Sequence, residues 1–286
     1  MLILDLLVQG LIQGGIYALI AIGLTLVYGL LRILHVAHAG LYALGGYIAI
    51  IVTNATDSFS LALVCSMIFV GLVGMAIYRI FYQPLLDKPP FVALIASIGL
   101  FIAMEEIYRI VFGAYGLTFV SPPLQGSVTI SHIYLRECEI VSMILAILLI
   151  IGLSLFTKYS RIGIAWRATV TDPEMAESFG VDVLKVRYLN FFIGSAMAAA
   201  AGSMVALLNN LVEPTMGSVP SYKALAIIVL GGLGNVKGTL IASLAIGIAE
   251  AFGTIYLGNI LDRDSIAFAF LIVVLMVKPQ GLFAKR

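Results

Sequence analysis

Two histidines, His35 and His38, stand three positions apart near the start of a strongly apolar chain. Imidazole binds metal ions and titrates near neutral pH, so this pair could hold a metal or carry a proton. A metal site needs more ligands than two, and the third histidine, His132, is far away in the sequence. We therefore favour packing or capping for His35 and His38, and expect neither a metal nor another cofactor.

One acidic residue, Glu250, lies within an apolar run. A carboxylate that faces lipid at the centre of a membrane helix costs roughly 2.5–3.5 kcal/mol. Glu250 should therefore face protein or a wet cavity, where it is hydrogen-bonded or neutral. A structural bond between helices and a role in a transport pathway both remain open. Glu105 and Arg109 are spaced i,i+4 and can pair on one helix face, which favours a structural role for them.

Motifs for catalysis or nucleotide binding are missing from the sequence. It contains no H-E-x-x-H, no G-x-S-x-G and no clustered carboxylates. The glycine-rich stretch GGLGNVKGT (231–239) has its lysine before a glycine and a threonine, which is the wrong order for a phosphate-binding loop. We expect neither an enzyme nor an ATP-driven motor in this chain.

The composition predicts the environment in which these residues must be positioned. Of the 286 residues, 62% are hydrophobic and 11% charged, and the mean hydropathy is +1.11. A soluble domain of this length could not build a polar exterior from so few charges, so lipid is the matching solvent. The net charge of +1 gives no indication of nucleic-acid binding, and two cysteines, Cys65 and Cys138, make no disulfide framework.

The apolar runs predict an all-α polytopic membrane protein with about eight or nine membrane segments in a single domain, 1–286. A spanning helix needs about 20 mainly apolar residues. The first run is too long for a signal-peptide core and is expected to be an uncleaved membrane helix. The stretch 222–257 is apolar but broken by glycines. Candidate segments are 6–31, 37–53, 60–82, 91–112, 139–157, 188–210, the broken 222–257 and the short 265–277.

The distribution of Lys and Arg predicts the orientation, because cytoplasmic loops carry an excess of these residues. With 158–187 in the cytoplasm, alternation places most basic residues inside and the N-terminus outside. It also makes 113–137 an external loop, in which Pro122 and Pro123 oppose a continuous helix and SVTISHIYL alternates like a strand. We expect a small folded cap there. The basic residues expected outside are Arg109, Arg136, Lys223 and Arg263.

The polar stretch RATVTDPEMAESFGVDVLKVR (167–187) predicts a short helix over about 172–180. Thr171 or Asp172 can cap it, Pro173 suits its first turn, and Gly180 can end it in the left-handed conformation. Met175 and Phe179 are four apart and share a face. A solvated connector and a helix that docks onto a cytosolic motor both fit this spacing.

Four stretches resemble the permeases of branched-chain amino acid ABC transporters, in the expected order over nearly the whole chain. They are the loop at 167–187 with its Arg-Ala, Asp-Pro-Glu and Gly-Val-x-Val, the opening pair of segments at 14–47, the glycine-broken segment at 222–250 and the closing KPQGLF at 278–283. The length resembles the shorter of the two paralogous permease subunits. That subunit usually has Asn-Phe-Ala-His-Gly-Glu where this chain has HVAHAG (35–40), so an acidic residue is missing.

The resemblance implies a permease subunit in the inner membrane of a prokaryote that forms the translocation pathway of an importer. Its implied partners are a paralogous or identical permease, two cytosolic ABC ATPases and an external substrate-binding protein, besides membrane lipid. The implied substrate is a branched-chain or related amino acid, with urea and short amides as alternatives. A stand-alone secondary transporter or channel for a small polar solute is the rival interpretation, but it gives the 167–187 loop no specific role.

The resemblance and the residue types together define two sets of candidate site residues. Glycines in membrane helices permit close packing, or mark a discontinuous helix that exposes backbone groups to a pathway. The coupling candidates are Arg167, Asp172, Pro173, Glu174, Met175, Phe179 and Gly180. The translocation-pathway candidates are His38, Tyr42, Gly45, Gly46, Gly231, Gly232, Gly234 and Glu250.

Overall fold

The computed structural model describes residues 2–130, 133–258 and 262–278. His132, most of the KPQGLF motif and the basic C-terminal end lie outside these ranges, and so do the expectations that concern them.

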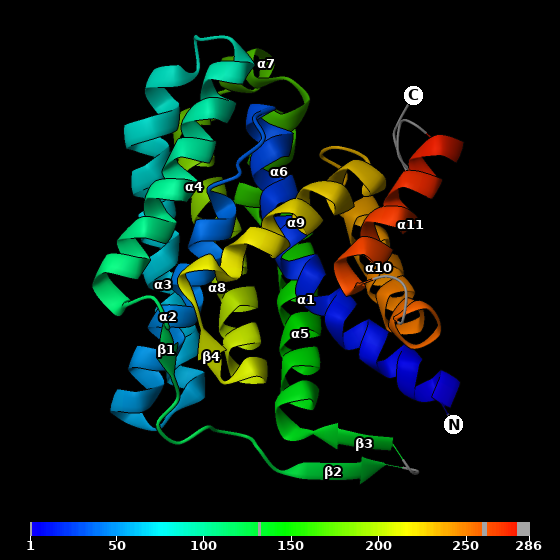
Figure 1. Cartoon of the computed structure of the whole chain (residues 1–286). Helices are drawn as coiled ribbons and strands as arrows, with labels where there is room; N and C mark the ends of the chain where they lie inside the picture. The colour runs from blue at the N-terminus through cyan, green and yellow to red at the C-terminus, as the bar shows by residue number, and fades with distance from the viewer. Residues whose placement is uncertain (1, 131–132, 259–261, 279–286) are drawn as a thin grey trace.

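Helices dominate the structure (Figure 1), which confirms the all-α polytopic fold. Seven helices in the described ranges are long and apolar enough to cross a membrane, and four are shorter. The long helices are α1 (Leu2–Leu31), α2 (His38–Thr56), α3 (Phe59–Ile77), α4 (Pro90–Phe112), α5 (Glu137–Tyr159), α8 (Val183–Asn209) and α10 (Val236–Leu257). The shorter helices are α6 (Arg161–Thr171), α7 (Pro173–Ser178), α9 (Ser218–Gly231) and α11 (Arg263–Val277). Three further turns are η1 (Tyr78–Tyr82), η2 (Gln83–Leu85) and η3 (Pro214–Gly217).

Two small antiparallel sheets lie between helices. Strands β2 (Ser127–Ile130) and β3 (Ile133–Arg136) form a hairpin, as the strand-like alternation of this stretch predicted. Strand β1 (Leu117–Thr118) pairs with β4 (Leu211–Val212), so the loop after α4 is tied to the segment after α8. In Figure 1 the β2–β3 hairpin and α7 lie at opposite ends of the helical bundle.

Helix α1 occupies the centre of the bundle, and it packs against α10, α8, α9 and α5. It is apolar on all sides because it is covered on most of them. Small residues bring α1 close to α10, since Gly14 faces the backbone of Leu244 and Gly10 faces that of Ile248. Without side chains at these points the two backbones approach directly, as in other membrane helix pairs.

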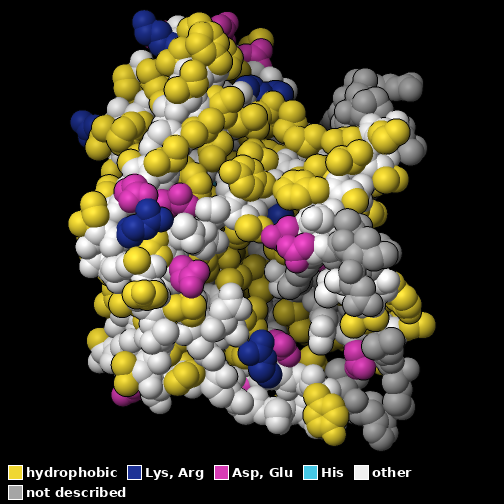
Figure 2. All heavy atoms as spheres, in the orientation of Figure 1, with side chains coloured by type: hydrophobic (Ala, Val, Ile, Leu, Met, Phe, Trp, Pro, Cys, Tyr) yellow, Lys and Arg dark blue, Asp and Glu magenta, His cyan; other side chains and the backbone are white. Residues whose placement is uncertain are grey.

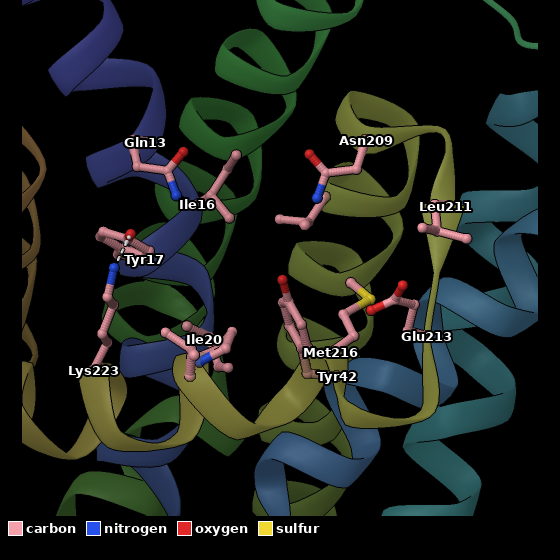
Figure 3. Close-up of a pocket in the computed structure, with 13 residues that line it drawn as sticks. Gln13, Ile16, Tyr17, Ile20, Tyr42, Asn209, Leu211, Glu213, Met216 and Lys223 are labelled. Carbon is pink, nitrogen blue, oxygen red and sulfur yellow. Dashed lines mark hydrogen bonds between the residues drawn. The ribbon is translucent and has the colours of Figure 1, made fainter. Parts of the chain in front are cut away.

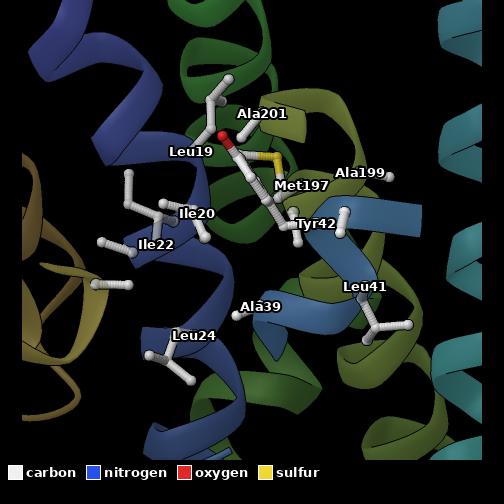
Figure 4. Packing of buried hydrophobic residues seen from close by; sticks show 14 of the residues in the cluster. Leu19, Ile20, Ile22, Leu24, Ala39, Leu41, Tyr42, Met197, Ala199 and Ala201 are labelled. Carbon is white, nitrogen blue, oxygen red and sulfur yellow. The ribbon is translucent and has the colours of Figure 1, made fainter. Parts of the chain in front are cut away.

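Helix α8 packs closely against α2 for the same reason. Its run Ala198–Ala201 is fully buried, and the small side chains leave room for α2 (Figure 4). A Cβ at Gly45 of α2 would lie 2.6 Å from the carbonyl oxygen of Ala199, closer than real Cβ contacts come. The core at this level therefore depends on residues without large side chains.

Two of the membrane crossings are interrupted, and in both of them a helix begins again at the depth of the middle of α1. The His38 side chain, at the first residue of α2, approaches the carbonyl oxygen of Ile20 at 3.2 Å. Ile20 lies eleven residues (31 − 20) before the end of α1, which at about 1.5 Å per residue is roughly 16 Å along the helix. Helix α2 therefore begins deep in the bundle, after a non-helical connection, 32–37.

Helix α9 begins at the same depth. The chain leaves α8, passes through β4 and η3, and resumes as a helix at Ser218. The starts of the two helices touch, because Gly217 lies against the carbonyl oxygen of Ala39. Helix α9 then ends at Gly231, and a turn with positive φ at Gly232 and Gly234 leads into α10, so the predicted glycine break is confirmed.

One predicted side-chain pair is wrong. Arg109 pairs with Glu106, at 2.5 Å, and not with Glu105. The Glu105 carboxylate instead accepts a hydrogen bond from the Ser218 hydroxyl, also at 2.5 Å. Glu105 thus ties α4 to the start of α9, a contact that spacing along one helix could not indicate.

Candidate functional site

A cavity of about 270 Å³ lies beside the point where α2 and α9 begin (Figure 3). This volume is just below the roughly 300–1,000 Å³ typical of small-molecule pockets, so it suits a small metabolite. The wall is mostly apolar with a few polar groups. Its residues are Gln13, Ile16, Tyr17, Ile20, Tyr42, Val205, Asn209, Leu211, Glu213, Met216, Val219, Pro220 and Lys223.

The spacing of these residues follows from the elements that carry them. Helix α1 contributes positions 13, 16, 17 and 20, which recur at helical spacing on one face. Helix α8 contributes Val205 and Asn209, and α9 contributes Val219 and Lys223, each pair four apart. The irregular segment between α8 and α9 supplies the rest of one wall. A broken crossing thus places residues of unlike type around one small space.

Tyr42 points its hydroxyl into this cavity (Figure 3). The side chain is 2% exposed, and its hydroxyl has no hydrogen-bond partner in the described part of the chain. A hydroxyl at a cavity wall can exchange a bound water for a polar group of a solute. The hydroxyl is therefore available to a polar group that enters the cavity.

A buried charge network forms the other side of the cavity. The Lys223 ammonium lies 2.8 Å from the Glu250 carboxylate and 2.7 Å from that of Asp264, and donates to the Tyr17 hydroxyl at 2.9 Å. The Tyr17 hydroxyl in turn donates to Glu250 at 2.8 Å. Lys223 and Glu250 are almost completely buried, whereas the Asp264 side chain is 39% exposed. The network joins α1, α9, α10 and α11.

This network confirms that Glu250 faces protein and not lipid, but it corrects the position of Lys223. Lys223 was expected on the external side, and its side chain is only 5% exposed, inside the bundle. The assumption that successive loops lie on alternate sides of the membrane failed here, because α9 begins at mid-depth. The rule that ionisable residues within a membrane pair with each other could have found Lys223, given its apolar surroundings in YKALAIIVL.

The two histidines lie behind the cavity wall, and neither lines the cavity. His35 Nδ1 is 2.6 Å from the Tyr82 hydroxyl, and the His35 and His38 rings are 5.6 Å apart. Both rings are buried among aromatic and aliphatic side chains, a packing position. Among the described residues there is no group of three or more His, Cys, Asp or Glu that could hold a metal ion.

The candidate glycines lie at helix contacts and at the turn between α9 and α10. Gly45 and Gly46 face Ala199 and Val212, and Gly231 faces the backbone of Gly238. Gly232 and Gly234 have φ of 91° and 81°, which favours glycine. Of the pathway candidates predicted from the sequence, only Tyr42 lines the cavity.

The second candidate site is the surface around α7, at the end of the bundle. Asp172 caps the helix by accepting from the backbone N–H of Met175 at 2.9 Å, and Pro173 is its first residue. Gly180 has φ of 82°, so the predicted left-handed stop is present. Met175 and Phe179 are 55% and 83% exposed. They border an open hollow of about 500 Å³ shared with α6, which includes Arg167 and Asp172, whereas Glu174 lies outside it.

A second cap anchors the chain after α7. Asp182 accepts from the backbone N–H of Lys185 at 3.0 Å and pairs with its ammonium at 2.9 Å. Hydrogen bonds from Lys185 lower the pKa of the Asp182 carboxyl, so it is ionised at neutral pH. Helix α8 therefore has a defined start at 183, five residues before the predicted 188.

The structure combines long apolar helices with two membrane crossings that are interrupted at mid-depth. A small, mostly apolar cavity lies beside these interruptions, and α7 lies at one end of the bundle. This arrangement is typical of a membrane transport protein. Residues 6–277 match the family described as the branched-chain amino acid transport system / permease component. The chain belongs to this family, which confirms the resemblance inferred from its motifs. The family is one of transport subunits and not of enzymes.

Individual relatives match over nearly the whole of this chain. The high-affinity branched-chain amino acid transport system permease protein LivH of Escherichia coli K12 is 33% identical over 97% of this chain and 94% of its own. BraD of Pseudomonas aeruginosa, described in the same terms, is 32% identical over 99% and 96%. LivM of Salmonella typhimurium, also a permease of such a system, is 25% identical over 93% of this chain and 67% of its own.

A solved structure shares the fold. PsaBC from Streptococcus pneumoniae in complex with Fab aligns with a TM-score of 0.54 at 14% identity, over 96% of this chain and 92% of the other. At this identity the likeness concerns the arrangement of helices alone.

Proposed function

We propose that this chain is a permease subunit of an ATP-driven importer for branched-chain or related amino acids, and that the cavity beside Tyr42 lies on its translocation pathway. The observation that carries the proposal is the cavity itself, placed where two broken crossings resume. Its size, its apolar wall and its few polar groups suit a small solute with one apolar and one polar end.

A second permease subunit is part of the proposal. The chain resembles both LivH and LivM, whose names identify them as permease proteins of one kind of transport system. The cavity is open on one side (Figure 2), where the surface between the main bundle and the α10–α11 arm is hollowed. A paralogous or identical permease that packs there would close the pathway.

We propose that α7 transmits movement from a cytosolic ATPase. Met175 and Phe179 present apolar surface to solvent at the end of the bundle, whereas Asp172, Pro173 and Gly180 fix the ends of the helix. A six-residue helix is too short to be stable alone, so it is held by these caps and by the packing of Ala176 against the rest of the chain. The exposed Met175 and Phe179 side chains remain available to a partner. Arg167 lines the same hollow as Met175 and Phe179, whereas Glu174 lies outside it.

The same assignment places α7 in the cytoplasm and the β2–β3 hairpin outside the inner membrane of a prokaryotic cell. The hairpin then faces the side from which an external binding protein delivers substrate. ATP-driven closure of the ATPase pair would shift the permease between two packings, one open inward and one open outward.

The experiment is uptake of labelled leucine into vesicles that contain this chain, its partner permease and both ATPases, supplied with the binding protein. ATP-dependent accumulation of leucine supports the proposal. Accumulation of urea or a short amide, with no competition by leucine, would reassign the substrate. Uptake that persists without the ATPases would indicate a stand-alone transporter and contradict the proposal.

A further inference from the structure

The carboxylate of Glu213 faces the cavity from the side opposite Lys223 (Figure 3). Glu213 stands on the non-helical segment between β4 and η3, and the residue is exposed. No ion pair or hydrogen bond of this carboxylate is present among the described residues. Because Glu213 is exposed, its carboxylate needs no partner within the chain and remains available to a group that enters the cavity.

Lys223 does not balance this charge. It already contacts two carboxylates, those of Glu250 and Asp264, at 2.8 and 2.7 Å. With all three groups ionised, the network carries a net charge of +1 − 2 = −1. Of these three charged groups only the Lys223 ammonium lines the cavity, and its charge is already offset by Glu250 and Asp264 behind it. Glu213 adds a negative charge at the opposite wall, so the wall at Glu213 favours a cation.

The low-polarity wall strengthens this preference. Ile16, Ile20 and Val219 exclude water from part of the cavity surface, and electrostatic interactions are stronger where water is excluded. A solute with a carboxylate as its only charge is repelled by Glu213. A solute with an ammonium group gains a charge-assisted hydrogen bond, which is stronger than a bond between neutral groups.

We propose that Glu213 binds the positively charged ammonium group of the transported amino acid, and so selects amino acids against the corresponding carboxylic acids. The hydroxyl of Tyr42 and the amide of Asn209 are placed to bond the adjacent carboxylate, and the apolar wall takes the side chain. This assignment rests on the proposed function and names the group that the cavity recognises.

The test measures binding to the purified permease pair without the binding protein, because that protein makes its own selection. Saturation-transfer NMR compares three ligands of nearly equal shape: leucine, 4-methylpentanoate, which lacks the ammonium, and 3-methylbutylamine, which lacks the carboxylate. For the parent chain we expect leucine and the amine to bind and the acid to bind at least about tenfold more weakly.

The variant Glu213→Gln removes the charge and nearly keeps the shape. We expect its affinity for leucine to fall by about tenfold to a hundredfold, and the preference of the amine over the acid to disappear. Glu106→Gln makes the same charge change on α4, where Glu106 pairs with Arg109 and does not line the cavity, and should bind as the parent does.

Two outcomes would overturn the proposal. One is a parent chain that binds 4-methylpentanoate as tightly as leucine, a comparison that needs no variant to fold. The other is a Glu213→Gln chain that binds as the parent does, or that loses only its association with the second permease, which would place Glu213 in that interface. If leucine uptake by the complete transporter continued in either case, the proposed function would stand without this assignment.

Discussion

The Lys223 ammonium lies 2.8 Å from a carboxylate oxygen of Glu250. The Lys223 side chain is 5% exposed and the Glu250 side chain 0% exposed. Removing one member of a buried ion pair leaves the other charge without compensation and typically costs about 3–5 kcal/mol. The pair joins α9 to α10 across the cavity wall, and Asp264 extends it to α11. It therefore couples the broken crossing to the C-terminal helices.

The network predicts unequal effects for its members. Lys223→Met leaves two carboxylates close together without their cation, so it should destabilise the protein by about 3–5 kcal/mol. Glu250→Gln leaves Lys223 paired with Asp264 and should cost less, about 1–3 kcal/mol. Thermal unfolding of the purified chain in detergent measures both. Equal losses would contradict the view that Lys223 is the shared centre.

The contact between α2 and α8 predicts a second stability effect. Gly45→Ala places a Cβ 2.6 Å from the Ala199 carbonyl oxygen, and overpacking of this kind costs about 1–3 kcal/mol. Gly152→Ala on α5 is the matched control, because a Cβ there meets nothing within 4 Å. Alanine is the better helix former, so the control should unfold at the parental temperature or slightly above it. A stable Gly45→Ala chain would mean that α2 and α8 separate readily.

The α7 surface predicts a loss of coupling without a loss of folding. Phe179 is 83% exposed in this chain, and burying such a side chain in a partner contributes about 1.5–3 kcal/mol. Phe179→Ala should loosen assembly with the ATPase or uncouple hydrolysis from transport. Glu177→Ala, on the same helix, should have a much smaller effect, since exposed charge pairs contribute under about 1 kcal/mol. Substrate-stimulated ATPase activity and uptake are the measurements, and parental values for Phe179→Ala would place the motor contact elsewhere.

The orientation is tested by labelling in intact cells. In a chain whose native Cys65 and Cys138 are replaced by serine, a membrane-impermeant thiol reagent should label Ser127→Cys in the β2–β3 hairpin. The same reagent should leave Asp182→Cys, just after α7, unlabelled until the cells are opened. The reverse pattern would invert the topology and remove the basis for assigning α7 to the ATPase side.

Local features of this structure could be predicted from the sequence because their causes are local. Asp172, Pro173 and Gly180 determine where α7 begins and ends through caps that involve only neighbouring residues. The glycine break after α9 follows from backbone conformations that favour glycine at Gly232 and Gly234. Apolar run lengths likewise predicted the long helices, since each must cross the same thickness of lipid.

The cavity could not be predicted in the same way. Its polar residues Tyr17, Tyr42 and Glu213 come from three elements that are far apart in the sequence. They meet because α2 and α9 begin at mid-depth, and hydropathy reports the composition of a segment and not its depth. For the same reason, Lys223 was wrongly expected on the external side. Glu250 was recognised as facing protein because the cost of burying a charge in lipid needs no knowledge of its partner.

Filling the cavity beside Tyr42 shows whether the solute passes through it. Val219 lines the cavity and is 42% exposed, so Val219→Trp can place a large ring in the space without disturbing the buried core. Val64→Trp, at a 52% exposed position on α3 away from the cavity, is the control. Both chains should assemble with the second permease and the ATPases, and ATP-dependent leucine uptake should fall to background for Val219→Trp alone. Parental uptake by an assembled Val219→Trp transporter would show that the pathway lies elsewhere.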